Sequence, residues 1–333
     1  MNRCGAGTLA GGQQSDVPFG ASRRRTKYLA IYRDIETLQD LEREYSPSSC
    51  IADIGVYLRS YSERSETARR LSPHLQSLDY GPDPVEKLDW FPAGDVPGRG
   101  LHAYIHGGYW QELGKNESSF PAIGLNRAGF DFAALSYGLA PAATLDQMVD
   151  RCRRAIVWMH RHAARLGIRN GIYLSGCSAG AHLAAMVLLT DWREQFGLEH
   201  SPIAGALLLS GIYDLEPIPL TYINQPLGLD ARGAARNSPL RVASAAAHLP
   251  PVLVAVGDNE TGEFKRQSRA FAAHLEQLGA SVHHMVVANR NHFDLIFDFG
   301  RHDTFLGRRL DEHMRFAWSG GATPAGQYRG AAD

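Results

Sequence analysis

The sequence GIYLSGCSAGAHLAAMVLL, residues 171–189, joins a short apolar run to an alanine-rich helical pattern through a tight turn. At the turn, Gly176, Ser178 and Gly180 form a GxSxG pattern. In a nucleophile elbow a serine lies at the tip of a strained strand-to-helix turn, and small neighbours let the backbone bend that sharply. A glycine-rich turn without function would share these five letters, but the flanking strand and helix favour Ser178 as a nucleophile.

Cys177 directly precedes this serine. In an elbow that side chain normally points away from the pocket, so we expect Cys177 to pack in the interior as a small apolar residue. Cys4, Cys50, Cys152 and Cys177 show no CxxC spacing. This sparse pattern is typical of free thiols in a reducing compartment.

Short apolar runs alternate along the chain with longer patterns in which apolar residues recur every three or four positions. The alternation predicts an α/β fold, with a mostly parallel central sheet and helices on both faces. The expected strands are an early edge strand at 88–91 and further strands at 101–105, 131–136, 171–174, 205–209, 252–256 and 282–287. The expected helices are 51–70, 144–166, 179–189, 263–278 and 302–316.

The chain has 333 residues, 44% of them hydrophobic, which is enough for one large core. We expect a single domain over 28–317, with disordered ends at 1–27 and 318–333, where Gly, Ala and polar residues dominate. Between 215 and 250, Pro, Gly and Ala occur without a clear period. We interpret this segment either as a cap or lid over the site or as a plain surface loop.

The charges of the chain balance, with 34 Lys and Arg against 35 Asp and Glu. This balance argues against a nucleic acid or an anionic membrane as partner and favours a small-molecule ligand. The basic cluster at 23–27 is interpreted as part of a solvated tail. The first twenty residues hold no continuous apolar run, so we expect a cytoplasmic protein without a signal or membrane anchor. The oligomeric state stays open, with a homodimer as one option.

A second motif, HGGYW at 106–110, follows the expected strand 101–105. Attack on a carbonyl creates an oxyanion, which two backbone NH groups can stabilise by about 3 kcal/mol per donor. We assign these donors to Gly107 or Gly108, together with Ala179 at the start of the elbow helix. His106 is expected to brace the loop.

A serine hydroxyl needs a base, and in this kind of fold the acid and then the histidine follow the serine along the chain. Asp258 ends the sequence PVLVAVGD, and His292 follows the next expected strand, so both belong to one edge of the sheet. We assign Asp258 as the acid and His292 as the general base. Glu260 and Glu263 are alternatives to Asp258, although Glu263 fits the start of the following helix, where an acid favours the helix dipole.

Among the 14 histidines, we favour only His292 for catalysis, because His283 and His284 fall in a strand and His160, His162, His182 and His274 in helices. No HExxH pattern or close set of histidines and carboxylates is present. We therefore expect neither a metal nor a cofactor.

With HGGYW at 106–110, GCSAG at 176–180, VGDNETGEFKRQS at 256–268 and NRNHFDLI at 289–296, the chain resembles the kynurenine formamidases, or arylformamidases, of the α/β-hydrolase fold. The resemblance begins near Glu44 and does not include the N-terminal extension. It implies hydrolysis of N-formyl-L-kynurenine to L-kynurenine and formate, a step of tryptophan catabolism in the kynurenine pathway.

The resemblance also implies a triad of Ser178, Asp258 and His292, in agreement with the residues chosen above. A formyl-enzyme would need little room on the acyl side and an aromatic-lined space on the amine side. Tyr109, Trp110 and Tyr213 are candidates for that lining, although Tyr109 and Trp110 could equally pack beneath the pocket. Arg290 is a candidate for the substrate carboxylate, with a plain surface role as its alternative.

Two rival functions remain open, because the same triad serves several reactions. The first is a carboxylesterase that acts on small esters. The second is a non-catalytic small-molecule sensor on a hydrolase scaffold, which is disfavoured because such proteins usually lose a member of the triad.

Overall fold

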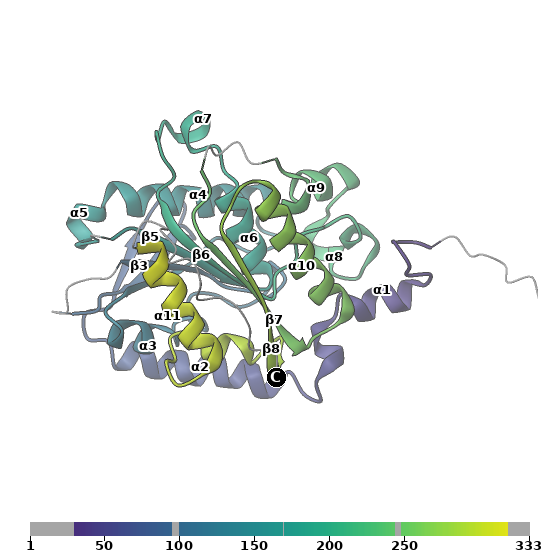
Figure 1. Cartoon of the computed structure of the whole chain (residues 1–333), viewed down its shortest axis with the longest axis horizontal. Coiled ribbons are helices and arrows are strands. Elements are labelled where there is room, and N and C mark those ends of the chain that lie inside the picture. Colours follow the sequence, from purple (N-terminus) through teal and green to yellow (C-terminus); the bar gives the residue numbers. More distant parts are fainter. Residues whose placement is uncertain (1–29, 95–99, 169, 244–247, 319–333) are drawn as a thin grey trace, which may run out of the picture.

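The strands of the described residues form one sheet in the order β1-β2-β4-β3-β5-β6-β7-β8 (Figure 1). The computed structural model describes residues 30–94, 100–168, 170–243 and 248–318. The predicted disordered ends 1–27 and 318–333 lie outside this part, apart from residue 318. The strands are β1 (Gln76–Asp79), β2 (Lys87–Phe91), β3 (Leu101–Ile105), β4 (Asp131–Leu135), β5 (Ile172–Cys177), β6 (Ile203–Leu209), β7 (Val252–Asn259) and β8 (Val282–Asn291).

The sheet is mostly parallel, as predicted. Only the pairs β1–β2 and β2–β4 are antiparallel, and the other five pairs, from β4–β3 to β7–β8, are parallel. The expectation that 88–91 forms an edge strand is wrong, because β1 pairs outside β2. The four residues of β1, QSLD, contain one apolar side chain, so no apolar run marks this strand.

Helices cover both faces of the sheet (Figure 1). One face carries α4 (Leu145–Arg161), α6 (Ala179–Leu188) and α10 (Gly262–Gln277), and the other carries α2 (Gly55–Arg70), α3 (Ala122–Arg127) and α11 (Phe305–Trp318). Shorter elements are α1 (Leu38–Glu44), η1 (Pro47–Cys50), α5 (Ala163–Leu166), α7 (Trp192–Phe196), η2 (Ile218–Leu220), α8 (Asn224–Leu227), α9 (Ala231–Arg236), η3 (Pro239–Arg241) and η4 (Leu295–Asp298).

β3 illustrates why the central strands read as continuous apolar runs. Leu101, Ala103 and Ile105 pack in the core on the α4 and α6 side, whereas Tyr104 packs in the core on the α11 side. A parallel strand covered by helices on both faces needs apolar or aromatic side chains at every position. Every residue of β3 is buried, which is consistent with that requirement.

The order of the strands creates a crevice at the carboxyl end of β3. The chain passes from β3 to β4 on one side and then returns to place β5 on the other side of β3. In open α/β sheets, ligands bind where the connections diverge in this way, outside the carboxyl ends of the strands. The HGGYW loop follows β3 and Ser178 follows β5, so both motifs lie at this point.

The segment 215–243, part of the predicted excursion, contains η2, α8, α9 and η3 rather than an unstructured loop. It is attached to the body of the protein at both ends. The Gln111 side chain donates a hydrogen bond to the Ile223 carbonyl (2.7 Å), and Arg236 forms an ion pair with Asp146. Residues 244–247 lie outside the described part.

Within the described ranges, no helix combines the length and apolar character needed to cross a bilayer. Cys50, Cys152 and Cys177 are free thiols, and Cys4 lies outside the described residues.

Candidate active site

Ser178 lies at the tip of the turn between β5 and α6, with backbone angles φ 57° and ψ −124°. A non-glycine residue with positive φ is strained, and such strain persists only where the surroundings impose it. Its NH group donates to the Leu209 carbonyl (2.8 Å), which fixes the turn to β6. A Cβ atom on Gly180 would lie 2.0 Å from the Ile105 carbonyl oxygen, so only glycine permits this close approach of the elbow to β3.

The HGGYW loop lies directly against this turn. A Cβ atom on Gly107 would lie 3.2 Å from Ser178 Cβ, which shows how closely the loop approaches the serine. The Gly108 carbonyl accepts hydrogen bonds from the NH groups of Gln111 and Glu112, both at 2.9 Å. Within the described residues, the NH groups of Gly107, Gly108 and Ala179 donate no backbone hydrogen bond outside regular elements, and their role as oxyanion donors stays a prediction.

His106 braces the loop, as expected. Its ring stacks on Tyr137 with centroids 4.4 Å apart, and its Nδ1 atom lies 2.8 Å from the Gly107 carbonyl. Burial lowers the pKa of His106 to about 4, so the ring is neutral at physiological pH. The Tyr137 hydroxyl donates to the His106 carbonyl (2.9 Å), which fixes the backbone of the loop as well.

His292 pairs with Glu260, and the assignment of Asp258 as its partner is therefore wrong. The distance from His292 Nδ1 to Glu260 Oε2 is 2.7 Å, and both side chains are buried. Asp258 is exposed and accepts a hydrogen bond from the Arg290 NH group (3.2 Å). Glu260, which the sequence offered as an alternative to Asp258, is the carboxylate that contacts His292.

The register of two strands explains this pairing. β7 and β8 are parallel, and Asn259 of β7 lies opposite Asn291 of β8. The next residues along the two strands, Glu260 and His292, therefore lie side by side. β7 ends at Asn259, three residues beyond the predicted end at 256. The first residue after the strand is therefore Glu260, whereas Asp258 lies within the strand.

Ser210 is a residue of this site that sequence reasoning missed. Its hydroxyl donates to Glu260 Oε1 (2.6 Å), and the Gly257 NH group donates to the same oxygen (2.7 Å). These two bonds leave Oε2 for His292, so the carboxylate is held in one orientation. Ser210 is fully buried and has φ 50°, a strained conformation at the end of β6 that marks it as a constrained position.

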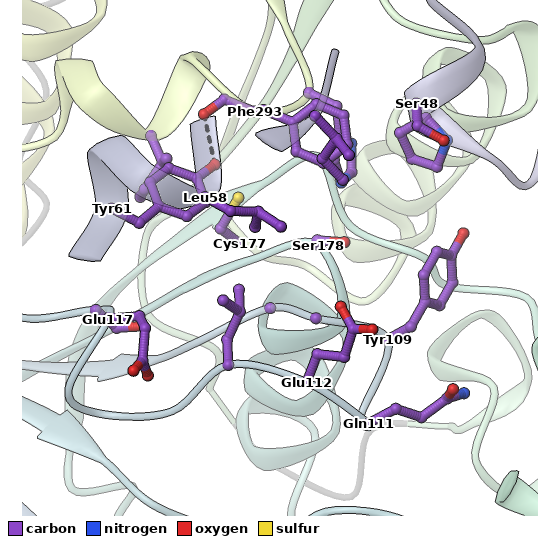
Figure 2. A pocket seen from close by; sticks show the side chains of 18 of the residues that line it. Ser48, Leu58, Tyr61, Tyr109, Gln111, Glu112, Glu117, Cys177, Ser178 and Phe293 are labelled. Atoms are coloured by element: carbon purple, nitrogen blue, oxygen red, sulfur yellow. Dashed lines mark hydrogen bonds between the residues drawn. The ribbon is translucent and has the colours of Figure 1, made fainter. Parts of the chain in front are cut away.

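Ser178 and His292 line one pocket together with Gly107 and Gly108 (Figure 2). The lining combines polar side chains, among them Ser46, Ser48, Tyr109, Gln111, Glu112 and Tyr222, with apolar and aromatic ones, among them Leu58, Tyr61, Tyr104, Leu113, Phe120 and Ile296. The side of the pocket built by the ends of β3, β5, β7 and β8 is called the floor below. A pocket of mixed character suits a ligand with an aromatic part and a polar part.

The opposite wall, residues 44–61, is called the roof, and it supplies lining residues from Ser46 to Tyr61. Hydrogen bonds tie the roof to the loops that carry Glu260 and His292. They run from Thr261 Oγ1 to the Glu44 carbonyl (2.6 Å), from Asn259 Nδ2 to the Cys50 carbonyl (3.2 Å), from Asn291 Nδ2 to the Tyr57 hydroxyl (2.9 Å) and from the Tyr61 hydroxyl to the Phe293 carbonyl. The segment 215–243 contributes Tyr222 to the pocket.

Trp110 and Tyr213 do not line the pocket, so the expectation of a substrate contact is wrong for both. Trp110 is fully buried and its indole NH donates to His182 Nδ1 (3.2 Å), while His182 Nε2 lies 2.7 Å from the Asn237 carbonyl. This chain of bonds ties the HGGYW loop to α6. Tyr213 is also fully buried and stacks on Phe271 with centroids 4.1 Å apart. Of the three predicted aromatic residues, Tyr109 borders the pocket.

Arg290 is not placed to meet a substrate carboxylate. Its guanidinium forms two hydrogen bonds with the buried carboxylate of Asp298 (3.0 and 2.9 Å), and the residue lies outside the pocket lining. Cys177 packs in the hydrophobic core, as expected, but the expectation that it points away from the pocket is wrong. Its thiol is buried but borders the pocket beside Ser178 (Figure 2), and burial raises the pKa of the thiol, which keeps it protonated.

A family model described as alpha/beta hydrolase fold matches residues 102–294. The kynurenine formamidases of Danio rerio and Salmo salar are each 40% identical to this chain over 77% of its length, and the alignments span 89% and 90% of those proteins. The chain belongs to the kynurenine formamidase family. A solved structure from Silicibacter sp. tm1040 matches with a TM-score of 0.69 and 26% identity, covering 80% of this chain and 97% of that one. The predicted fold class and family are thus confirmed.

This member of the kynurenine formamidase family holds no obvious metal centre in its described part. No group of three or more His, Cys, Asp or Glu residues there is arranged to bind a metal ion. Ser178, Glu260 and His292 follow one another along the chain in the order nucleophile, acid, histidine that is typical of this fold.

Proposed function

We propose that this chain hydrolyses N-formyl-L-kynurenine to L-kynurenine and formate, with Ser178 as nucleophile, His292 as general base and Glu260 as the acid that orients it. The proposal rests above all on the 2.7 Å pair of His292 and Glu260 at the pocket that also holds Ser178. Family membership supports N-formyl-L-kynurenine as the substrate. The contact of His292 with Glu260 beside Ser178 supports hydrolysis through a serine nucleophile.

In the first half-reaction, Glu260 accepts a hydrogen bond from the Nδ1–H group of His292, and this tautomer leaves the Nε2 lone pair free to take the hydroxyl proton of Ser178. The serine oxygen forms a bond to the formyl carbon. The resulting oxyanion accepts hydrogen bonds from the NH group of Ala179 and from Gly107 or Gly108. His292 then donates its proton to the anilide nitrogen, the carbon–nitrogen bond breaks, and the arylamine of L-kynurenine leaves.

In the second half-reaction, the formyl group remains as an ester on Ser178. Water gives a proton to His292 and attacks the formyl carbon, so the same NH groups stabilise a second oxyanion. His292 returns the proton to the serine oxygen as the ester bond breaks. Formate leaves and the enzyme is restored, with no metal or cofactor in any step.

A direct assay tests the proposal. Purified protein is given N-formyl-L-kynurenine, and release of the arylamine is followed by absorbance. We expect turnover by the wild type and a loss of about 10⁶ in kcat in Ser178→Ala, by analogy with other serine hydrolases. An unchanged circular dichroism spectrum of Ser178→Ala is the control for folding. Absence of turnover by the well-folded wild type would refute the proposal.

A carboxylesterase activity is a second candidate, and the apolar residues of the pocket lining favour it. Leu58, Leu113 and Ile296 offer room for an acyl chain that a formyl group does not need. Short-chain nitrophenyl esters separate the two functions. A kcat/KM for esters far above that for N-formyl-L-kynurenine would make the chain an esterase, and lack of fluorophosphonate labelling at Ser178 would revive the non-catalytic sensor.

We further propose a cytoplasmic location and a single domain over 28–317, with the oligomeric state open to a homodimer. The balanced charge and the sparse cysteines support a cytoplasmic location.

Size-exclusion chromatography with light scattering would decide between monomer and dimer. Limited proteolysis would test whether 215–250 opens as a lid.

A further inference from the structure

The pocket lining carries acidic side chains without basic ones. Among the described residues that line it, the charged side chains are the carboxylates of Glu112 and Glu117, and neither Lys nor Arg is present. Nearby cations are already paired elsewhere. Lys115 binds the buried carboxylate of Asp89 (2.9 Å), and Arg290 binds Asp298. The pocket therefore offers a negative potential without a fixed counterion.

Glu112 is the carboxylate placed to act on the reacting centre. Its NH group donates to the Gly108 carbonyl (2.9 Å), so its backbone is fixed to the oxyanion loop. No hydrogen bond or ion pair with another described residue engages its carboxylate. Figure 2 shows this carboxylate directed toward Ser178 and Tyr109, whereas that of Glu117 points away from the serine.

A carboxylate next to an oxyanion hole has an electrostatic consequence. An uncompensated negative charge there opposes the negative charge that develops on the substrate oxygen. A substrate that carries its own cation would neutralise Glu112 and remove this penalty. N-formyl-L-kynurenine has an α-ammonium group on the side chain ortho to the formamide, so the cation is close to the reacting carbon.

We propose that Glu112 is a specificity-determining residue that binds the α-ammonium group of the substrate. This inference rests on the proposed function and deepens it. The enzyme selects aryl formamides that carry a cation, and Glu112 contributes to the selection both by attraction and by disfavouring uncharged substrates. The substrate carboxylate meets no cation in this pocket, in contrast to the role predicted for Arg290.

The test compares N-formyl-L-kynurenine with 4-(2-formamidophenyl)-4-oxobutanoate, which lacks only the α-amino group. The readout is the ratio of the two kcat/KM values. Glu112→Gln should lower this ratio about 1.5- to fivefold, the range for an ion pair at an exposed side chain such as Glu112. The wild-type ratio should also fall as salt is raised from about 0.01 to 1 M, since screening weakens such a pair.

Glu117→Gln is the matched control, because it removes the other carboxylate of the lining and should keep the ratio. An unchanged ratio in Glu112→Gln, or an equal fall in both variants, would overturn the inference. Inhibition of nitrophenyl acetate hydrolysis by L-kynurenine and by its deamino analogue gives a second readout that needs no formamide turnover. If the wild type does not hydrolyse N-formyl-L-kynurenine, the proposed function fails, while this ratio of inhibition constants still tests Glu112.

Discussion

The floor and the roof of the pocket are built by different means. On the floor, Glu260 and His292 directly follow the paired residues of two adjacent parallel strands, so backbone hydrogen bonds fix their separation. The roof comes from the N-terminal part of the chain and is attached by side-chain hydrogen bonds to loops far away in sequence. The difference indicates that the sheet specifies the chemistry, whereas the attached roof shapes the space for the substrate.

The largest expected effect separates two acids of the floor. Glu260→Gln should lower kcat by about 10⁴, as for the acid of other triads, because glutamine cannot stabilise the imidazolium that forms during the reaction. Asp258→Asn is the matched variant, two residues away and exposed, and should stay near wild type. Steady-state kinetics on N-formyl-L-kynurenine measures both. The reverse ranking would restore Asp258 as the acid.

Acid should weaken the body of the protein that carries the floor. Burial lowers the pKa of His102 to about 3 and those of His106, His182 and His313 to about 4. Below pH 6.5 these rings take up protons in the unfolded chain but not in the folded one. The free energy of unfolding therefore falls as pH drops from 6.5 toward 4, by about 1.4 kcal/mol per pH unit for each histidine.

Denaturant titrations at several pH values measure this slope. His102→Phe keeps a ring in contact with Tyr173 and removes one titrating group. The change in the free energy of unfolding per pH unit should therefore become smaller by the contribution of one histidine. A stability that is flat between pH 6.5 and 5 would contradict the assignment. The described roof contains no histidine, so the acid effect should come from the body rather than the roof.

A smaller effect is expected at Ser210. Ser210→Ala removes one of the two hydrogen bonds to Glu260 Oε1, and the bond from Gly257 remains. We expect about a tenfold loss in kcat with little change in KM. Steady-state kinetics measures both constants, and circular dichroism checks the fold of the variant. A loss of folded protein with a wild-type kcat in the folded fraction would indicate a purely structural role.

The smallest effect tests the roof. Glu44 Oε2 accepts a hydrogen bond from the Glu263 NH group (2.9 Å) at the start of α10, where Thr261 provides no side-chain cap. Glu44→Ala should cost about 1 kcal/mol of stability through the lost cap. It should also raise KM about threefold and leave kcat near wild type, because it loosens the roof rather than the triad. A large fall in kcat would show that roof and floor are not separable.

The sequence predicted the floor far better than the roof. The HGGYW loop and Ser178 follow the buried strands β3 and β5, whose apolar runs are easy to recognise, and His292 follows the partly exposed strand β8. The acid was missed by two residues because β7 continues through the polar residues 257–259, where the apolar run has ended. Pairing with β8 keeps these residues in the strand, and a pairing partner cannot be seen in a local pattern.

No sequence pattern comparable to the apolar runs of the strands indicated the roof. Ser46 and Ser48 lie in a short polar segment that reads as an ordinary turn, and their place over the pocket depends on contacts with residues more than 200 positions away. Trp110 and Tyr213 show the opposite error. Their chemistry suits a substrate pocket, but the hydrogen bond to His182 and the stacking on Phe271 place them in the core.

The pairing of β7 with β8 sets the separation of Glu260 and His292. Val282 to Val287 pair regularly with β7, and the register then shifts by two residues before Asn291. Adding or deleting a single residue within the regular part would turn the side chains that follow it to the opposite side of the sheet, because neighbouring strand positions face opposite ways. Changes of length in this strand should therefore abolish turnover even where the core tolerates them. During divergence of the family, sequence change here must proceed by substitution, whereas loops distant from the ladder are free to grow.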